Sequence, residues 1–83
     1  MSSTDAAWDD LNNDVLGVFT DDRPRTTGEV ERDRPGLPSS YVRAALTHNA
    51  EFGYLTARRG AVHTTYTRTE TGRARLADTK AMA

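Results

Sequence analysis

Four apolar residues near the start of the chain recur at the spacing of a helix: Trp8, Leu11, Val15 and Phe19. Leu16 and Val18 lie beside them, so the pattern predicts an amphipathic helix over residues 6–20. The sequence "TDDRPR" then ends this helix with a proline turn. We expect residues 1–7 to be a disordered tail.

A second, shorter helix is predicted over residues 27–34. Thr26 is followed three residues later by Glu29, which is the pattern of a capping box. Arg34 precedes Pro35, and a residue before proline is driven out of the helical region. The sequence "RPGLPS" is therefore expected to be a turn.

A third helix is predicted over residues 39–51. Ser39 suits the N-cap, and Gly53 suits the left-handed position beyond the C-terminus. The apolar positions of this helix form one anchored face: Val42, Ala45 and Leu46. Phe52 and Leu55 are expected to pack back against the core.

The next segment has the signals of a β-hairpin. "YLTAR" and "VHTTYTRT" are rich in β-branched and aromatic residues, and the "RGA" between them supplies a turn. Alternation puts one set of side chains on one side of the second strand, namely Val62, Thr64, Tyr66 and Arg68. The other side takes His63, Thr65 and Thr67. A last helix starts near Thr69 or Glu70, which gives an α+β fold, mostly α, in a single domain over residues 8–81.

Composition excludes several classes of function. There is no Cys, so disulfides and thiolate metal sites are ruled out. No segment approaches the roughly 18 apolar residues of a membrane span, and the acidic start is unlike a leader, so we expect a cytoplasmic protein that does not enter membranes. The two histidines have no second ligand at a metal spacing, and no nucleophile elbow or phosphate loop is present. We expect no enzyme activity, metal, cofactor or small-molecule substrate.

Charge is divided unevenly along the chain. Residues 1–22 carry six acids and no base, whereas residues 23–83 carry eleven bases and six acids. This asymmetry fits either an acidic first helix packed beside an ordinary mixed surface, or a two-faced domain whose basic side meets a polyanion. Ten Arg against one Lys and eight Asp against four Glu also fit a salt-adapted organism, although high-GC coding alone would give the first bias.

The second and third helices, with the turn between them, form a helix-turn-helix pattern. In that arrangement the second of the pair offers the residues that point away from its anchored face to base edges in the major groove of DNA. These residues are Ser39, Ser40, Tyr41, Arg43, Ala44, Thr47 and His48. Arg43 suits a bidentate contact with guanine, and Ala44 suits the thymine methyl group. A solvated helix face is the alternative interpretation of the same pattern.

The hairpin carries basic residues close behind that helix. Arg58 and Arg59 fall at its tip, and Arg68 falls on the returning strand. Such residues suit contact with phosphates or with the minor groove. Exposed hairpins also carry charge simply to prevent edge-to-edge aggregation, so this alternative stays open.

In this order of segments the chain resembles the winged helix-turn-helix transcription regulators, including small haloarchaeal and phage-type repressors and MarR-, PadR- and ArsR-like proteins. The resemblance covers residues 8–77 and is carried by "TTGEV", "GLPSSYVRAAL", "EFGYLTAR" and "YTRTETGRARL". The matching positions are Gly36, Leu37, Val42, Leu46, Gly53, Tyr54, Leu55, Tyr66, Thr69 and Gly72.

Three positions depart from the family pattern. Glu31 stands where the second helix usually has a small Ala, and Asn49 stands where a Leu usually continues the core stripe. An unpaired buried Asn49 would cost about 1–3 kcal/mol. Pro38 replaces the usual Ser or Thr cap, a role that Ser39 is expected to take over.

The resemblance implies a three-helix core, a β-hairpin wing and a C-terminal helix. It further implies a sequence-specific regulator of transcription, a repressor, that binds double-stranded DNA as a homodimer. Residues 39–51 would enter the major groove, and the wing, residues 54–68, would contact the backbone or minor groove. The alternative is a winged helix that binds proteins without DNA, its acidic first helix docking a basic partner. An RNA-binding winged helix is a third possibility.

Overall fold

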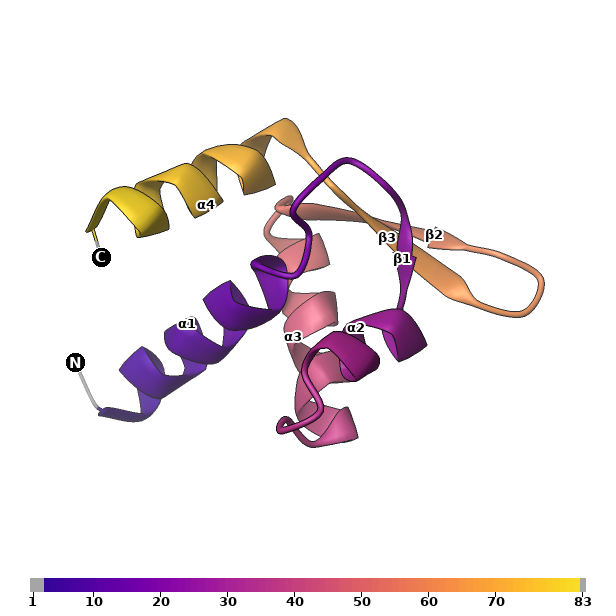
Figure 1. The fold of residues 1–83 in the computed structure, drawn as a ribbon, viewed down its shortest axis with the longest axis horizontal. Helices are drawn as coiled ribbons and strands as arrows, with labels where there is room; N and C mark the ends of the chain where they lie inside the picture. The colour runs from indigo at the N-terminus through magenta and orange to yellow at the C-terminus, as the bar shows by residue number, and fades with distance from the viewer. Residues whose placement is uncertain (1–2, 83) are drawn as a thin grey trace.

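Four helices and a three-stranded antiparallel sheet make up the part of the chain that the computed structural model describes, which is residues 3–82 with side chains from residue 10 to residue 78 (Figure 1). In chain order they are α1 (Ser3–Leu16), β1 (Arg25–Thr26), α2 (Thr27–Asp33), α3 (Ser39–Glu51), β2 (Leu55–Arg59), β3 (Thr64–Arg68) and α4 (Glu70–Met82). The α+β class expected from the sequence is thus confirmed.

Helix α1 lies several residues earlier than the sequence predicts. It begins at Ser3, inside the expected tail, where Ala6 and Ala7 favour helix, and it ends at Leu16 rather than residue 20. Beyond it the backbone tightens, because Val18 N–H donates to Val15 O and Phe19 N–H to Leu16 O. This turn directs Val18 and Phe19 into the core. The Trp8 side chain and residues 1–2 of the expected tail lie outside the described part.

The predicted capping box at α2 is confirmed. The Glu29 N–H donates to Thr26 Oγ1 at 3.2 Å, and the Thr26 N–H donates to Glu29 Oε1 at 3.1 Å. This backbone hydrogen bond, together with one from the Thr26 hydroxyl, holds the pKa of the Glu29 carboxyl below its ordinary value. Thr26 also ends β1, a two-residue strand that the sequence pattern did not predict.

Helix α3 has the predicted bounds but a different N-cap. Pro38, not Ser39, occupies that position and makes no side-chain hydrogen bond, while its carbonyl accepts from the N–H groups of Tyr41 and Val42. The prediction for Ser39 is therefore wrong. Gly53 takes the expected left-handed conformation, with φ of 79°.

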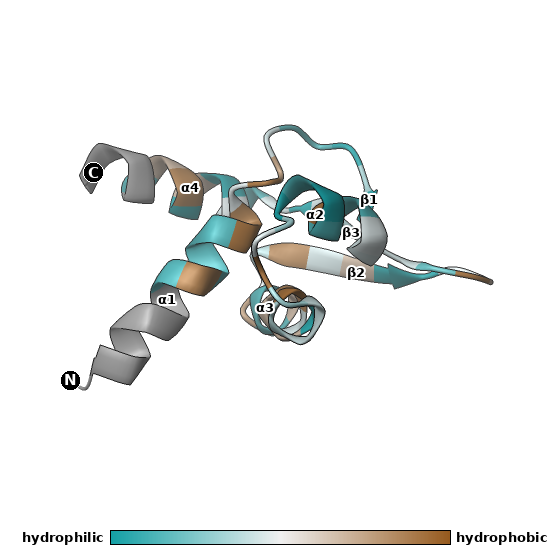
Figure 2. Cartoon of the chain, turned by 60° about the horizontal axis from the view of Figure 1, so that its bottom comes forward, coloured by the Kyte–Doolittle hydropathy of each residue, from teal (hydrophilic) through white to brown (hydrophobic). Residues whose placement is uncertain are grey.

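The core lies where α1, α3 and β2 meet, and Figure 2 shows apolar residues gathered there. Its buried members are Val15, Leu16, Val18, Phe19, Val30, Val42, Ala45, Leu46 and Leu55. Leu55 confirms its prediction, whereas Phe52 is 60% exposed, so that prediction is wrong. Asn49 is buried with its amide paired, because Nδ2 donates to Ala45 O at 2.9 Å and to Asn12 O at 3.1 Å.

The sheet has the order β1–β3–β2, with β3 in the centre. Tyr66 is the register partner of Ala57 on one side and of Arg25 on the other. The returning strand begins at Thr64, so Val62 and His63 belong to the turn and not to the strand predicted for them. Gly60 N–H donates to His63 O across that turn at 2.8 Å.

Helix α4 begins at Glu70, as predicted, and its N-terminal end is joined to Gly53 and Tyr54, the two residues before β2. Thr69 caps it, because its Oγ1 accepts from the Gly72 N–H at 2.9 Å and donates to Gly53 O at 2.6 Å. The Thr69 N–H donates to Tyr54 O. From the core, α1 and α4 extend to the side opposite the hairpin (Figure 1).

Candidate nucleic-acid interface

Helix α3 is held against the core by one face, and its opposite face is open to solvent. Val42, Ala45, Leu46 and Asn49 are buried. The outer face of α3, as we name it here, consists of exposed residues at helical spacing: Ser40, Arg43, Ala44, Thr47 and Glu51. Figure 2 shows α3 at the edge of the molecule, beyond α2 and β2. A straight helix with exposed short side chains and one arginine is thus presented on a rigid base.

The N-terminal turn of α3 is tied to α2 by Glu31. Ser39 Oγ donates to Glu31 Oε1, so the Ser39 hydroxyl faces α2 and not solvent alone. The same carboxylate oxygen lies 3.9 Å from Arg43 Nε. The Arg43 side chain is nevertheless 72% exposed. Glu31 was singled out in the sequence only as an awkward neighbour for α3, and its reach to the outer face was missed.

Two of the residues predicted to contact DNA lie on the flank of α3. Tyr41 is exposed, while His48 is half-buried, and the centroid of its ring lies 4.4 Å from the centroid of the Phe52 ring. The rings of Phe52 and Tyr54 are stacked, with their centroids 6.3 Å apart. We name this set, His48, Phe52 and Tyr54, the aromatic row. His48 thus packs beside Phe52 at the C-terminal end of α3, whereas Tyr41 stays exposed near the N-terminal end.

The hairpin carries two exposed arginines, and one of them, Arg59, lies beside the C-terminal half of α3. Arg58 and Arg59 are both exposed, and neither makes an ion pair within the described residues. An open groove separates α3 from the hairpin, lined by Thr47, Ala50, Glu51, Ala57, Arg59, Thr64 and Tyr66. Thr47 and Arg59, both predicted site residues, thus line one surface.

Glu51 was missed as part of the site. It lies four residues after Thr47 and eleven after Ser40, a spacing from which the sequence could have revealed it. Its carboxylate puts a negative charge at the C-terminal end of the outer face, where it disfavours a nearby phosphate. Thr47 Oγ1 donates to Arg43 O at 3.0 Å and keeps its lone pairs for an outside donor.

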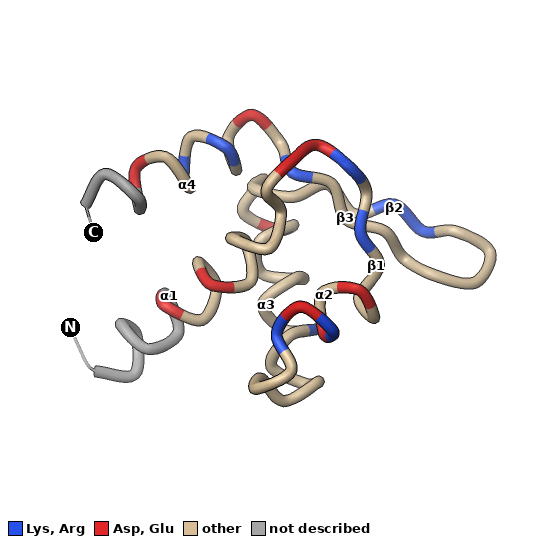
Figure 3. Tube along the Cα trace, in the orientation of Figure 1, with Lys and Arg blue, Asp and Glu red and all other residues tan. Residues whose placement is uncertain are grey.

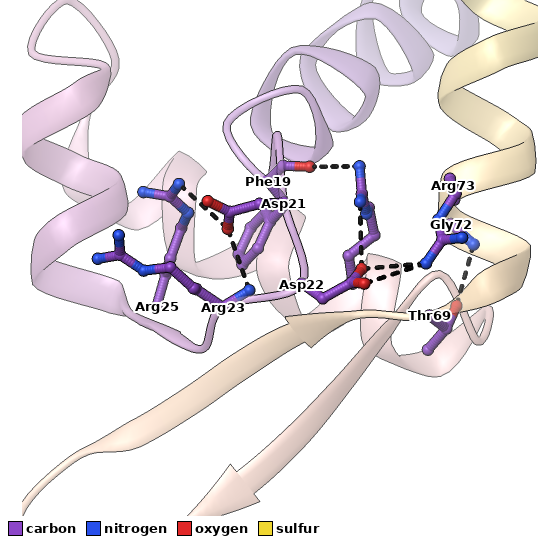
Figure 4. Close-up of polar contacts among 9 residues, drawn as sticks. Phe19, Asp21, Asp22, Arg23, Arg25, Thr69, Gly72 and Arg73 are labelled. Atoms are coloured by element: carbon purple, nitrogen blue, oxygen red, sulfur yellow. Dashed lines mark hydrogen bonds and ion pairs between the residues drawn. The ribbon is translucent and has the colours of Figure 1, made fainter.

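Arg68 does not belong to this surface, which corrects the prediction for it. Its side chain is 13% exposed, with Nη1 donating to Phe19 O at 3.2 Å and Nη2 to Asp22 Oδ1 at 3.1 Å. Asp22 also accepts from Arg73, at 3.1 and 3.2 Å (Figure 4). The hydrogen bonds from Arg68 and then from Arg73 hold the pKa of the Asp22 carboxyl below its ordinary value. Because it bonds to Phe19 O and Asp22, Arg68 joins the α1–β1 connection to β3.

Three of the six acids in the first 22 residues are paired with arginines from later in the chain. Acids of the first 22 residues pair with later arginines: Asp14 with Arg34, Asp21 with Arg25, and Asp22 with Arg68 and Arg73. Figure 3 shows acidic and basic segments alternating through the region where these elements meet, with a basic segment on β2 leading to the hairpin tip. The charge left for a partner is therefore concentrated in a few arginines, including Arg43, Arg58 and Arg59.

Within the described residues, no group of three or more His, Cys, Asp or Glu side chains is arranged to hold a metal ion. None of the helices in that same part of the chain combines the length and apolar character needed to cross a bilayer. Comparisons with protein-family models, with curated proteins and with solved structures found no match to this chain.

Proposed function

We propose that this chain is a winged helix-turn-helix regulator of transcription, a cytoplasmic repressor that binds double-stranded DNA in a sequence-specific manner and is not an enzyme. The observation that carries the proposal is the pairing of an anchored α3, whose outer face is exposed, with a neighbouring hairpin that presents Arg58 and Arg59. In this assignment α2 and α3 are the helix-turn-helix pair, and β2 with β3 is the wing.

The dimensions and chemistry of the outer face support this assignment. The major groove of B-DNA, about 12 Å wide, admits one α-helix, and α3 lies at the edge of the molecule with its outer face exposed (Figure 2). Arg43 would donate to guanine, Ala44 would meet a thymine methyl, and Ser40 and Thr47 would bind bases or phosphates. Arg58 and Arg59 would neutralise phosphates on the flank.

We also propose that the protein acts as a homodimer on a palindromic site. A two-fold contact repeats the same surface on both copies, so it must leave both DNA-binding faces free. Helices α1 and α4 extend to the side away from the hairpin (Figure 1), and a contact through them meets that requirement. Dimerisation would also help a chain of 83 residues reach useful stability.

The test is fluorescence anisotropy of a labelled random-sequence duplex, titrated with the purified protein at two salt concentrations. DNA binding predicts an affinity that falls steeply as salt rises, because bound cations are released from phosphates. A selection from random DNA then identifies the preferred site, and a palindromic product would support the dimer. Absence of salt-dependent binding would contradict the proposal.

The rival function is a protein-interaction module, and one observation favours it. Phe52 is 60% exposed and lies between the rings of His48 and Tyr54, and a group of aromatic rings at the surface is a feature that protein partners bind. This surface adjoins the outer face of α3, because His48 follows Ala44 by one helical turn. The same titration separates the two functions, and replacing the duplex with structured RNA tests the RNA-binding possibility.

A further inference from the structure

Glu31 is a carboxylate beside the surface proposed to meet a polyanion. Its side chain is 31% exposed, and it lies on α2, not on the helix proposed to enter the groove. A negative charge near phosphates weakens binding to any DNA sequence. The Glu31 carboxylate therefore lowers affinity for DNA unless another interaction of Glu31 offsets this effect.

The two contacts of Glu31 both involve α3. Oε1 accepts a hydrogen bond from Ser39 Oγ, which fixes the carboxylate against the first turn of the helix. The same oxygen lies 3.9 Å from Arg43 Nε. Because Ser39 holds the Glu31 carboxylate in one position, the attraction of that carboxylate restricts the Arg43 side chain more than a freely rotating carboxylate would.

The atom of Arg43 that faces Glu31 decides what remains for DNA. Nε is the Arg43 nitrogen that lies 3.9 Å from the carboxylate, an ion-pair distance, while Nη1 and Nη2 make no hydrogen bond within the described part of the chain. These two nitrogens form a fork whose spacing fits guanine O6 and N7. Ordering a long side chain before binding lowers the entropy that binding must otherwise remove.

We propose that Glu31 is the positioning residue that determines specificity at the base pair contacted by Arg43. Glu31 directs the Nη1–Nη2 fork of Arg43 toward guanine. Its negative charge also repels phosphates, which weakens every complex in which Arg43 makes no base contact to offset that repulsion. This inference rests on the proposed function, because it assigns a role within the same DNA interface.

The experiment measures the ratio of affinities for two duplexes by anisotropy. One duplex carries the site selected from random DNA by the wild-type protein, with variants in which each guanine is replaced in turn. The other has random sequence. The proteins are the wild type, Glu31→Gln, Glu31→Ala, Arg43→Ala and Glu31→Gln/Arg43→Ala, each first shown to be folded by circular dichroism.

We expect Glu31→Gln to bind the random duplex more tightly and to lose about three- to tenfold of the specificity ratio, within the range of a single weakened base contact. The loss should be confined to one guanine position. In the Arg43→Ala background, Glu31→Gln should leave the ratio unchanged, because no fork remains to be positioned.

Glu51→Gln is the matched control, because it removes a carboxylate from the outer face two turns beyond Arg43. It should tighten binding to both duplexes equally and keep the ratio. A ratio unchanged by Glu31→Gln and Glu31→Ala, or lowered equally with and without Arg43, would overturn this inference while leaving DNA binding intact. A wild type that binds neither duplex would overturn the proposed function, and this inference with it.

Discussion

Asn49 is a buried polar residue on the otherwise apolar inner face of α3. Its position continues the apolar stripe of α3, where the resemblance calls for Leu, and an unpaired amide there would be costly. The amide is satisfied by two carbonyls, one in its own helix and one in α1. Asn49 therefore joins the two helices through a directed contact, in addition to the packing around it. The sequence identified the position but could not reveal the α1 carbonyl, 37 residues away.

Substitutions at Asn49 should follow a defined order of stability. Asn49→Ala removes both hydrogen bonds and leaves a small void, which we expect to destabilise the fold by about 1–3 kcal/mol. Asn49→Asp should be worse, because a buried carboxylate would then face two carbonyl oxygens. Asn49→Leu should be the mildest, since it removes the polar group and fills the space. Urea denaturation at pH 7 measures the order, and wild-type stability in Asn49→Asp would contradict the assigned donor role.

At the scale of elements, helix ends were predicted correctly where the residues that define them are neighbours in the chain. The capping box fixed α2, and Gly53 fixed the end of α3, because both act through neighbouring residues. Strand β1 was missed because two residues carry no periodicity, and its pairing is set by Tyr66 and Thr65 far along the chain. The end of α1 was misplaced because the apolar pattern continues to Phe19 after the backbone has already turned.

The packing of α4 against Tyr54, the residue before β2, requires the Gly72 backbone to lie close to the Tyr54 carbonyl. A Cβ added at Gly72 would lie 2.1 Å from Tyr54 O, so the backbone of one element would have to move. Helix propensity alone favours Gly72→Ala, since Ala is the better helix former. We expect the clash to prevail and Gly72→Ala to destabilise the protein by about 1–3 kcal/mol, measured as the shift in thermal unfolding.

Gly36→Ala is the control for that substitution. Gly36 is exposed and an added Cβ would meet nothing within 4 Å, so its effect should stay within about 0.5 kcal/mol. Gly72→Ala equal to or more stable than the wild type would mean that α4 does not pack against Tyr54 as described.

Asp22 joins three elements, and its contribution should depend on pH. Arg68 and Arg73 lower the pKa of its carboxyl in the folded state below the ordinary value of 3.8. A lowered folded-state pKa contributes stability that is present above the unfolded-state pKa and is lost as pH falls through the folded-state pKa. Without this charge, the guanidinium of Arg68, 13% exposed, keeps only the Phe19 carbonyl.

Asp22→Asn should therefore be less stable than the wild type at pH 7, and the difference should shrink below about pH 4. Urea denaturation of both proteins between pH 2.5 and 7 measures it. Asp10→Asn removes an exposed carboxylate with no ion pair among the described residues and should have a smaller effect at pH 7. A constant difference between wild type and Asp22→Asn across the whole range would argue against this role.

For the whole molecule, the division of charge along the chain was a poor guide to the interface. Asp14, Asp21 and Asp22 pair with later arginines of the same chain. Arg68 was assigned to DNA because sequence alternation cannot reveal a guanidinium bonded to Asp22. The outer face of α3 was predicted better, because helical spacing specifies which residues share a face. What the fold adds is the distinction between arginines that are already neutralised and those that are free.

That distinction predicts different salt dependences for two arginines. Arg59 lies exposed at the hairpin and lines the groove beside α3, whereas Arg73 pairs with Asp22 on α4. If Arg59 neutralises a phosphate, Arg59→Ala should weaken binding to all duplexes similarly and reduce the slope of log affinity against log salt by about 1. Arg73→Ala should leave the slope unchanged at a temperature where it remains folded. Equal slopes for Arg59→Ala and the wild type would remove the hairpin from the DNA interface, while a reduced slope for Arg73→Ala would place α4 within it.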